Sequence, residues 1–234
     1  MSTQPIPAQQ LPPLTKSDIH EKGITAHLEE IHKEFRDGFD FLKKYPKSVT
    51  IYGSARSTVE SEHWAQAETL GRRIVKELGY TVITGGGPGM MAAAHKGAHE
   101  GGGSAVALGI KLPHEANTND FATDRLQFQY FFARKTMLSF AAEAYIFMPG
   151  GFGTFDELFG VLTLIQTRKI PSVPIILIGT HFWNGLVDYM VKSMVSHNFI
   201  AEYDLNMFKV TDDIDEALEI IRTAPVSEWW RNIN

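Results

Sequence analysis

Two glycine-rich stretches of this sequence have the composition of loops that bind phosphate groups. They are TGGGPGM at residues 84–90 and PGGFGT at residues 149–154. A glycine lets backbone N–H groups approach an anion because no Cβ atom stands in the way. The second stretch also precedes a predicted helix that starts near Thr154, whose dipole and hydroxyl group favour an anion there. We therefore predict a phosphate site formed by Gly150, Gly151, Gly153 and Thr154.

The first stretch leaves other interpretations open. GPGMMA, at residues 87–92, matches the loose G-x-G-x-x-A form of a dinucleotide-binding loop. However, the strand that should end in a ribose-binding acid is followed first by Lys111, and Glu115 comes late. Neither stretch continues into the Gly-Lys-Ser/Thr of a Walker A loop. We favour one phosphate group over NAD or FAD, and tight strand–helix turns are the simpler alternative. Further candidate phosphate contacts lie at the carboxyl ends of the first two predicted strands: Gly53, Ser54, Gly86 and Gly87.

Two carboxylates, Asp156 and Glu157, follow the second glycine-rich stretch. Acidic residues in the first turn of a helix complement its dipole, and this explains Asp156 without any further role. Glu157 lies close in sequence to the predicted phosphate site. A carboxylate beside a bound sugar phosphate can stabilise an oxocarbenium ion or direct a water molecule at it. We therefore predict a catalytic role for Glu157.

Three more charged residues are candidates for the same site. Arg134 opens the predicted helix ARKTML, and its guanidinium can bind ribose or phosphate oxygens if the preceding strand delivers it to the rim of the sheet. A surface arginine is the alternative. Lys135 is expected from its position to be solvated, and it stays a candidate phosphate contact. Glu115 is a weaker candidate for a base or ribose contact, with a solvated loop acid as the alternative.

The elements that position these residues alternate between apolar strands and amphipathic helices at least five times. The strand runs are continuously apolar, as in strands that are buried on both faces of a sheet. This pattern predicts an α/β fold with a single Rossmann-like, doubly wound, mainly parallel sheet flanked by helices. We expect residues 1–20 to be a flexible tail and residues 21–234 to form one domain. The predicted strands are 48–55, 80–87, 104–110, 127–132, 144–150 and 173–179, and predicted helices include 62–79, 133–143, 154–169 and 181–197.

Composition excludes several classes of function. The 234 residues carry a net charge of −5, which argues against general nucleic-acid binding. With no cysteine, the chain has no disulfide, no thiolate zinc site and no cysteine nucleophile. We expect no membrane span, because no apolar run reaches about 18 residues. The first residues lack the pattern of a secretory signal, so a cytoplasmic location is expected.

The motif PGGFGTFDE at residues 149–157 has the form P-G-G-x-G-T-x-x-E. Together with ARKTM upstream and GGGPGMM earlier, it resembles the Lonely-guy family of nucleotide phosphoribohydrolases, which were long described as lysine decarboxylases. The resemblance covers about residues 48–195, and LGIKLPHEANTN and LTLIQTRKI are similar to the longer bacterial form. The decarboxylase description has no support in the sequence, because a pyridoxal enzyme needs a Schiff-base lysine and a larger cofactor site.

The resemblance implies hydrolysis of the N-glycosidic bond of a nucleoside 5'-monophosphate, of the AMP or cytokinin riboside type. The products are the free base and ribose 5-phosphate. The family's catalytic pair falls on Arg134 and Glu157, and its phosphate-binding glycines and threonine fall on the second stretch. The resemblance also implies a homodimer without a metal or redox cofactor. A non-catalytic nucleotide-binding or carrier protein of the same fold is the alternative.

The sequence departs from the family pattern at two positions. The longer form usually carries glutamate and asparagine in GGGPG-x-M-E-A-A-N, where this chain has Ala92 and His95. A carboxylate and an amide are therefore lost near the first glycine-rich stretch. His95 raises the hypothesis of a general acid that protonates the leaving base. A structural histidine inside the helix is the alternative.

Overall fold

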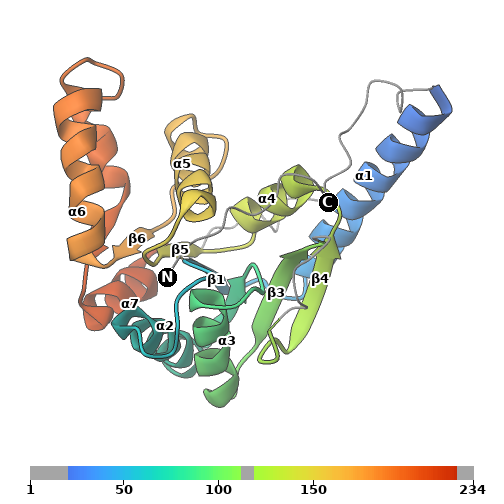
Figure 1. The fold of residues 1–234 in the computed structure, drawn as a ribbon, viewed down its shortest axis with the longest axis horizontal. Helices are drawn as coiled ribbons and strands as arrows, with labels where there is room; N and C mark the ends of the chain where they lie inside the picture. The colour runs from blue at the N-terminus through green and yellow to red at the C-terminus, as the bar shows by residue number, and fades with distance from the viewer. Residues whose placement is uncertain (1–20, 112–118, 226–234) are drawn as a thin grey trace, which may run out of the picture.

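The computed structural model describes residues 21–111 and 119–225 (Figure 1). The predicted tail at residues 1–20 and the candidate residue Glu115 lie outside this range. Seven strands form one sheet in the order β4-β3-β2-β1-β5-β6-β7, and every neighbouring pair is parallel. The predicted α/β class with a Rossmann-like parallel sheet is therefore confirmed. The strands are β1 Ser48–Tyr52, β2 Thr81–Thr84, β3 Ala105–Ile110, β4 Asp124–Phe128, β5 Ala144–Phe147, β6 Ile175–Ile178 and β7 Lys209–Thr211.

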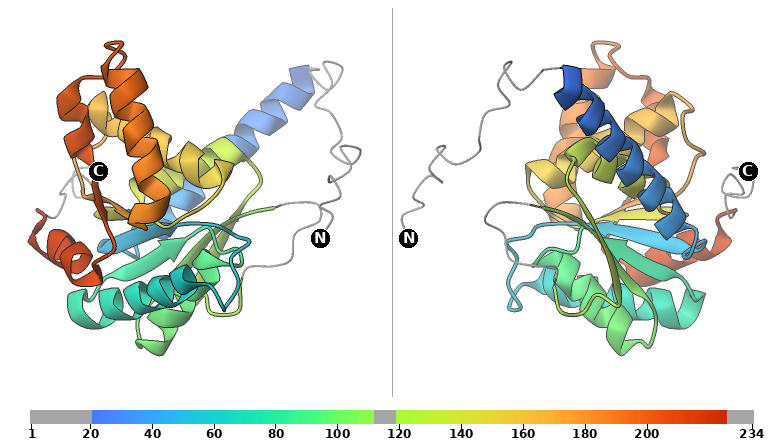
Figure 2. Two further views of the ribbon diagram at one scale, coloured as in Figure 1. Left: turned by 60° about the vertical axis from the view of Figure 1, so that its left-hand side comes forward. Right: turned by 90° about the vertical axis from the view of Figure 1, so that its right-hand side faces the viewer.

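Helices cover both faces of this sheet (Figures 1 and 2). One face carries α1, α4, α5 and α6, and the opposite face carries α2, α3 and α7. Two of the helices, α2 and α6, continue into π-helical turns. The helices are α1 Glu21–Leu42, α2 Glu62–Arg73 with η2 Ile74–Leu78, α3 Met90–Glu100, α4 Phe131–Phe140, α5 Phe152–Gln166, α6 Thr180–Tyr189 with η3 Met190–Val195, η4 Glu202–Met207 and α7 Ile214–Thr223.

Two hydrophobic cores fill the spaces between the sheet and its helices. Successive side chains of a strand point to opposite faces, so each strand contributes to both cores. In β5, Tyr145 and Phe147 pack toward α4 and α5, whereas Ala144 and Ile146 pack toward the helices of the other face. All four side chains are buried. This double burial explains why the strand runs are continuously apolar in the sequence.

Several predicted element boundaries differ from those in the structure. The strand predicted at 127–132 lies at Asp124–Phe128, and α4 begins at Phe131 rather than at residue 133. The helix predicted from Thr154 begins at Phe152. Gly153 therefore lies in the first turn of α5, although glycine is a poor helix former.

The strand order reverses between β1 and β5, and this reversal creates the site for a ligand. The two strands are paired so that their last residues, Tyr52 and Phe147, are neighbours. The chain leaves β1 toward α2 on one face and leaves β5 toward α5 on the other face. The two loops therefore diverge, and a crevice opens beyond the carboxyl ends of the strands.

Among the helices that the structure describes, none is both long enough and apolar enough to cross a membrane.

Candidate active site

A cavity of about 1300 Å³ opens at the carboxyl ends of β1 to β5. It collects residues that are far apart in the sequence, from the β1 loop to α5. Ten of the residues predicted from sequence line it. They are Gly53, Ser54, Gly86, Gly87, Arg134, Gly150, Gly151, Gly153, Thr154 and Glu157. The structure thus brings together both glycine-rich stretches and the two predicted catalytic residues.

The first turn of α5 forms one end of this cavity. Gly151 is the N-cap, and its carbonyl accepts the N–H groups of Thr154 and Phe155 at 3.0 and 3.1 Å. The N–H groups of Phe152 and Gly153 have no acceptor among the described residues, as expected for the start of a helix. A Cβ atom added at Gly151 or Gly153 would meet nothing within 4 Å. This turn therefore presents unpaired donors to open space, which is what a phosphate group requires.

The turn before α3 packs against the neighbouring β1 loop and does not face open space as the first turn of α5 does. Gly89 has a φ of 67°, and a Cβ atom there would overlap the backbone of Ser54 and Ala55. The N–H group of Met90, the first residue of α3, donates to the carbonyl of Ser54 at 3.0 Å. The N–H group of Ser54 in turn donates to Pro149 at 3.0 Å. The β1 loop is therefore clamped between the two glycine-rich stretches, and the first stretch serves mainly to hold this arrangement.

Glu157 lies on the second turn of α5 and is 8% exposed. Its Oε2 atom is buried and has no hydrogen-bond partner among the described residues. Burial raises the pKa of this carboxyl to about 7, against the opposing effects of Arg134 and Lys135. Because a buried polar atom normally has a partner, the unpaired oxygen marks Glu157 as a group that is available to a ligand.

The side chain of Arg134 is held in place by the sheet. Its Nε atom donates to the carbonyl of Leu108 in β3 at 2.8 Å. The guanidinium also lies directly over Gly85, where a Cβ atom would overlap it. The sequence predicted that Arg134 would reach the rim of the sheet, and the structure places it in the cavity. The absence of a side chain at residue 85 is what makes room for it.

Lys135 and Asp156 form a pair beside the cavity. The Nζ atom of Lys135 lies 2.6 Å from Oδ1 of Asp156 and donates to its backbone carbonyl at 3.0 Å. Lys135 does not line the cavity, although it was a candidate phosphate contact and was expected to be solvated. Asp156 and Glu157 were expected in the first turn of α5. They lie one turn further in because the helix starts at Phe152.

His95 and Ala92, the two departures from the family pattern, are both buried on α3 and neither lines the cavity. The Nε2 atom of His95 lies 3.1 Å from the carbonyl of Val106, which can only accept, so this nitrogen carries the hydrogen. The same nitrogen lies 3.0 Å from Thr84 Oγ1, which accepts the N–H group of Gly86. Burial lowers the pKa of His95 to about 4. The structure therefore supports the structural interpretation of His95 over the general-acid hypothesis.

Sequence reasoning missed other residues of the cavity, among them Tyr52, Met91, Arg125, Gln127 and Phe131. A signal for two of them was present in β4, whose sequence is DRLQF. Polar and apolar residues alternate there, which places Arg125 and Gln127 on one face of the strand. The sequence analysis expected the strand three residues later and did not use this pattern.

The charged side chains of the cavity are mostly basic. Arg56, Lys111, Arg125 and Arg134 line it, against the two acids of α5. This balance favours an anionic ligand. Across residues 21–111 and 119–225, no three histidine, aspartate or glutamate side chains are grouped closely enough to hold a metal ion.

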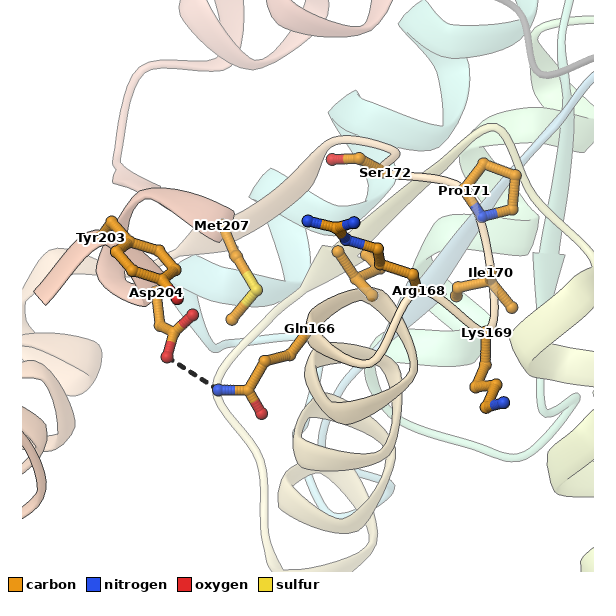
Figure 3. A pocket seen from close by; sticks show the side chains of 10 residues that line it. Gln166, Arg168, Lys169, Ile170, Pro171, Ser172, Tyr203, Asp204 and Met207 are labelled. Atoms are coloured by element: carbon orange, nitrogen blue, oxygen red, sulfur yellow. Dashed lines mark hydrogen bonds between the residues drawn. The ribbon is translucent and has the colours of Figure 1, made fainter. Parts of the chain in front are cut away.

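A second cavity, of about 710 Å³, lies at the other end of α5 (Figure 3). Arg168, Lys169, Tyr203 and Met207 contribute to its lining. It contains none of the residues predicted to bind or react. Because it borders the carboxyl end of α5, its two cations complement the negative end of the helix dipole. The first cavity, which has the helix amino end and the buried acid, is therefore the candidate active site.

Several known proteins are similar to this chain in sequence. The sequence model of the family described as "Possible lysine decarboxylase" matches residues 91–221, more than half of the chain. The cytokinin riboside 5'-monophosphate phosphoribohydrolase of Rhodococcoides fascians is 26% identical over 76% of this chain and 90% of its own length. The cytokinin riboside 5'-monophosphate phosphoribohydrolase LOG of Oryza sativa subsp. japonica is 30% identical over 67% of this chain and 64% of its own.

A solved structure with a similar fold is that of the molybdenum cofactor carrier protein from Chlamydomonas reinhardtii. It superposes with a TM-score of 0.55 at 22% identity, covering 76% of this chain and 98% of that one. At this identity, the similarity concerns the fold alone.

Proposed function

This chain belongs to the Lonely-guy family, whose description is possible lysine decarboxylase, and we propose that it hydrolyses nucleoside 5'-monophosphates. The substrate is of the AMP or cytokinin riboside monophosphate type. Water adds to C1' of the ribose, and the bond from C1' to the base breaks with its electron pair going to the base nitrogen. The products are the free base and ribose 5-phosphate.

The observation that carries this proposal is the position of Glu157 one turn after the unpaired N–H groups of α5. A phosphate bound by Phe152, Gly153 and Thr154 places the attached ribose next to the buried carboxylate. Binding of the phosphate supplies the energy that holds the sugar in this position. A protein that only bound nucleotides would gain nothing from a buried carboxyl group whose oxygen lacks a partner, because a buried polar atom without a hydrogen bond lowers the folding stability of the protein.

Glu157 acts in its ionised form. The carboxylate stabilises the positive charge that develops on the ribose ring as the base departs, and it orients the attacking water. A pKa of about 7 leaves a substantial fraction of the group ionised at neutral pH and still makes it a competent proton acceptor. The water's proton therefore passes to Glu157 as the C1'–O bond forms, and the departing base nitrogen takes up a proton from the solvent, to which Glu157 later returns its own.

Arg134 holds the sugar and phosphate oxygens in the orientation that this step requires. Its Nε atom is used by Leu108, so the terminal nitrogens form the face that meets the ligand. Burial raises the pKa of Glu157, and the positive charge of the same guanidinium lowers it. Arg134 therefore keeps more of this carboxyl group ionised. Arg134 and Glu157 are in this way the catalytic pair.

The decisive experiment incubates the purified protein with AMP, GMP, CMP and isopentenyladenosine monophosphate and measures the free base by chromatography. We expect base release from monophosphates and none from the corresponding nucleosides, because the phosphate provides the positioning energy. Glu157→Gln should abolish release while AMP still binds. If no monophosphate is cleaved although AMP binds to the wild type, the protein is a non-catalytic nucleotide-binding or carrier protein.

A homodimer is also part of the proposal. The apolar face of α1 continues beyond the body of the protein, where Ile24 is 41% and Leu28 is 60% exposed. Phe131 and Phe132, at the start of α4, are 61% and 50% exposed. Apolar side chains gathered in this way favour burial against a second copy of the chain.

A further inference from the structure

From the proposed phosphate site at the first turn of α5, the cavity extends in one direction across the sheet, toward β4. Its lining starts at α5 after β5 and continues through the loops of β1, β2 and β3 to β4. Four strand spacings of about 4.8 Å make this a distance of about 19 Å. Of the residues after β6 that the structure describes, up to residue 225, none belongs to the lining. A ligand whose phosphate lies at α5 must therefore extend toward β3 and β4.

At the end of the cavity formed by β3 and β4, a side chain of β4 lies directly against a glycine of β3. Gln127 of β4 is paired with Gly109 of β3. A Cβ atom at Gly109 would lie 2.5 Å from both the Nε2 and the Oε1 atoms of Gln127. The amide of Gln127 therefore lies flat over the glycine, on the side of the sheet edge that lines the cavity. Without the glycine, this amide would have to point elsewhere.

Arg125 adds a second polar group to the same end. It lies two residues before Gln127, so both side chains leave β4 on the same face. No acidic side chain pairs with its guanidinium among residues 21–111 and 119–225. Met91 from α3 and Phe131 from α4 line the cavity as well, and these two helices cover opposite faces of the sheet. The lining of this end therefore combines apolar side chains, which suit the faces of a flat ring, with polar side chains, which suit its edge.

We propose that Gln127 and Arg125 recognise the hydrogen-bonding edge of an unmodified purine base, and that they exclude bases with an apolar substituent on that edge. This inference rests on the proposed function, because the proposed phosphate site fixes the direction of the ligand. Amide and guanidinium groups form paired hydrogen bonds with purine edges. An isoprenoid chain on N6 of adenine would remove water from both groups without replacing its hydrogen bonds, and sites of this kind reject such ligands strongly.

The proposal is tested by binding, so that it does not depend on turnover. The probes are the carbocyclic analogues of AMP and of N6-isopentenyl-AMP, in which carbon replaces the ring oxygen and no oxocarbenium ion can form. Isothermal titration calorimetry gives both dissociation constants for the wild type. We expect the AMP analogue to bind at least about ten-fold more tightly than the isopentenyl analogue.

Two variants and a control locate the effect. Gln127→Leu should bring the ratio of the two dissociation constants close to one or invert it. Gly109→Ala leaves the amide in the protein but displaces it, and it should reduce the ratio as well. Gln129→Leu, an exposed residue outside the cavity, should leave the ratio unchanged.

Two outcomes overturn the inference when the analogues bind, and absence of binding is a third. One is equal or tighter binding of the isopentenyl analogue by the wild type, and the other is a ratio that Gln127→Leu does not change. Failure of the proposed function has a different signature, because then base release is absent while the AMP analogue still binds selectively. Binding of neither analogue would contradict the base-recognition proposal itself.

Discussion

At the scale of single residues, Glu157 is held in a state that costs stability. The carboxyl is buried, one oxygen has no partner, and its pKa lies at about 7 in the folded protein, above the ordinary value of 4.5. The folded state therefore binds more protons than the unfolded state between these two values. Stability falls as the pH rises through this window, and the loss is complete above about pH 7. The catalytic role that we propose for Glu157 would account for a group with this cost.

The first prediction is that Glu157→Gln stabilises the protein in a pH-dependent way. The neutral amide removes the cost of ionising a buried group, which is at most about 3 kcal/mol for this shift in pKa. The gain should be present at pH 8 and small at pH 5, and denaturant unfolding at both pH values measures it. Asp156→Asn is the control, because its exposed ion pair with Lys135 contributes only about 1 kcal/mol or less. Equal gains from Glu157→Gln at the two pH values would contradict the burial argument.

The second prediction concerns the glycine beneath Arg134. Gly85→Ala places a Cβ atom against the guanidinium and should move it, with little change in the fold. A displacement of this kind costs on the order of 100-fold in kcat/KM when the group positions the substrate. Steady-state base release from AMP and a thermal unfolding curve are the two measurements.

Gly160→Ala is the matched control for this prediction. A Cβ atom there would press on the flexible end of Lys135, which lies outside the cavity. Both variants replace a glycine that contacts a basic side chain, but only the first affects Arg134, which we propose to be catalytic. Comparable losses of kcat/KM in both variants would show that the contact with Arg134 is not the cause.

At the scale of elements, α5 joins the two parts of the site. Its first turn offers N–H groups to an anion, and its second turn carries the buried acid and the exposed partner of Lys135. The helix starts two residues earlier than its sequence suggests, and this brings Gly153 and Thr154 into the first turn. A single rigid helix therefore fixes the distance between the phosphate and the carboxylate, and no loop has to be ordered for it.

The third prediction separates ligand binding from stability in this helix. Gly151→Ala and Gly153→Ala introduce a Cβ atom into space that is open in the free protein. Folding stability should be unchanged or raised by up to about 1 kcal/mol, because alanine restricts the unfolded chain. The affinity for AMP should fall at least about ten-fold, since the new methyl group occupies the position of the phosphate.

Gly185→Ala in α6 serves as the control, because a Cβ atom there also meets nothing within 4 Å and the residue is remote from the cavity. It should match the other two variants in stability and the wild type in affinity. Calorimetric titration with AMP and thermal unfolding provide both values. Wild-type affinity in Gly151→Ala and Gly153→Ala would place the phosphate elsewhere.

At the scale of the whole molecule, α1 extends away from the sheet beside β4 (Figure 1). Its carboxyl-terminal half packs against α4 and β4, where Phe41 and Leu42 are buried, but its amino-terminal half is exposed. The regular spacing of apolar residues along the helix does not stop where the contact with the body stops. Because this apolar face is exposed among the described residues, it supports the proposed pairing with a second copy of the chain.

The fourth prediction is that Leu28→Arg converts a dimer into a monomer. Analytical ultracentrifugation of the wild type should give about twice the mass of one chain at micromolar concentration. The variant should sediment as a single chain with unchanged helix content, because a charge in the interface has to be desolvated. Glu29→Arg, on the same exposed turn but off the apolar face, should leave the dimer intact. A monomeric wild type would contradict the proposed dimer.

The sequence by itself determined the fold class and much of the site. Double burial of parallel strands makes their sequences continuously apolar, and this property is local enough to recognise in one chain. The glycine-rich stretches and the position of Glu157 shortly after one of them are also local, since strand, turn and helix follow one another directly. Arg134 could be placed because α4 must return from the rim of the sheet. None of these inferences required knowledge of a distant contact.

Only the tertiary structure decided which side chains meet across the sheet. The space above Gly85 for Arg134, the amide of Gln127 over Gly109 and the pair of Lys135 with Asp156 each join segments separated by at least 18 positions in the chain. The tertiary structure also decided the burial of His95 between β2 and β3, where its two contacts are each 11 positions away in the chain. Spacing in a sequence reports periodicity within one element. Contacts between elements depend on strand order and register, because these set which residues share one end of the sheet.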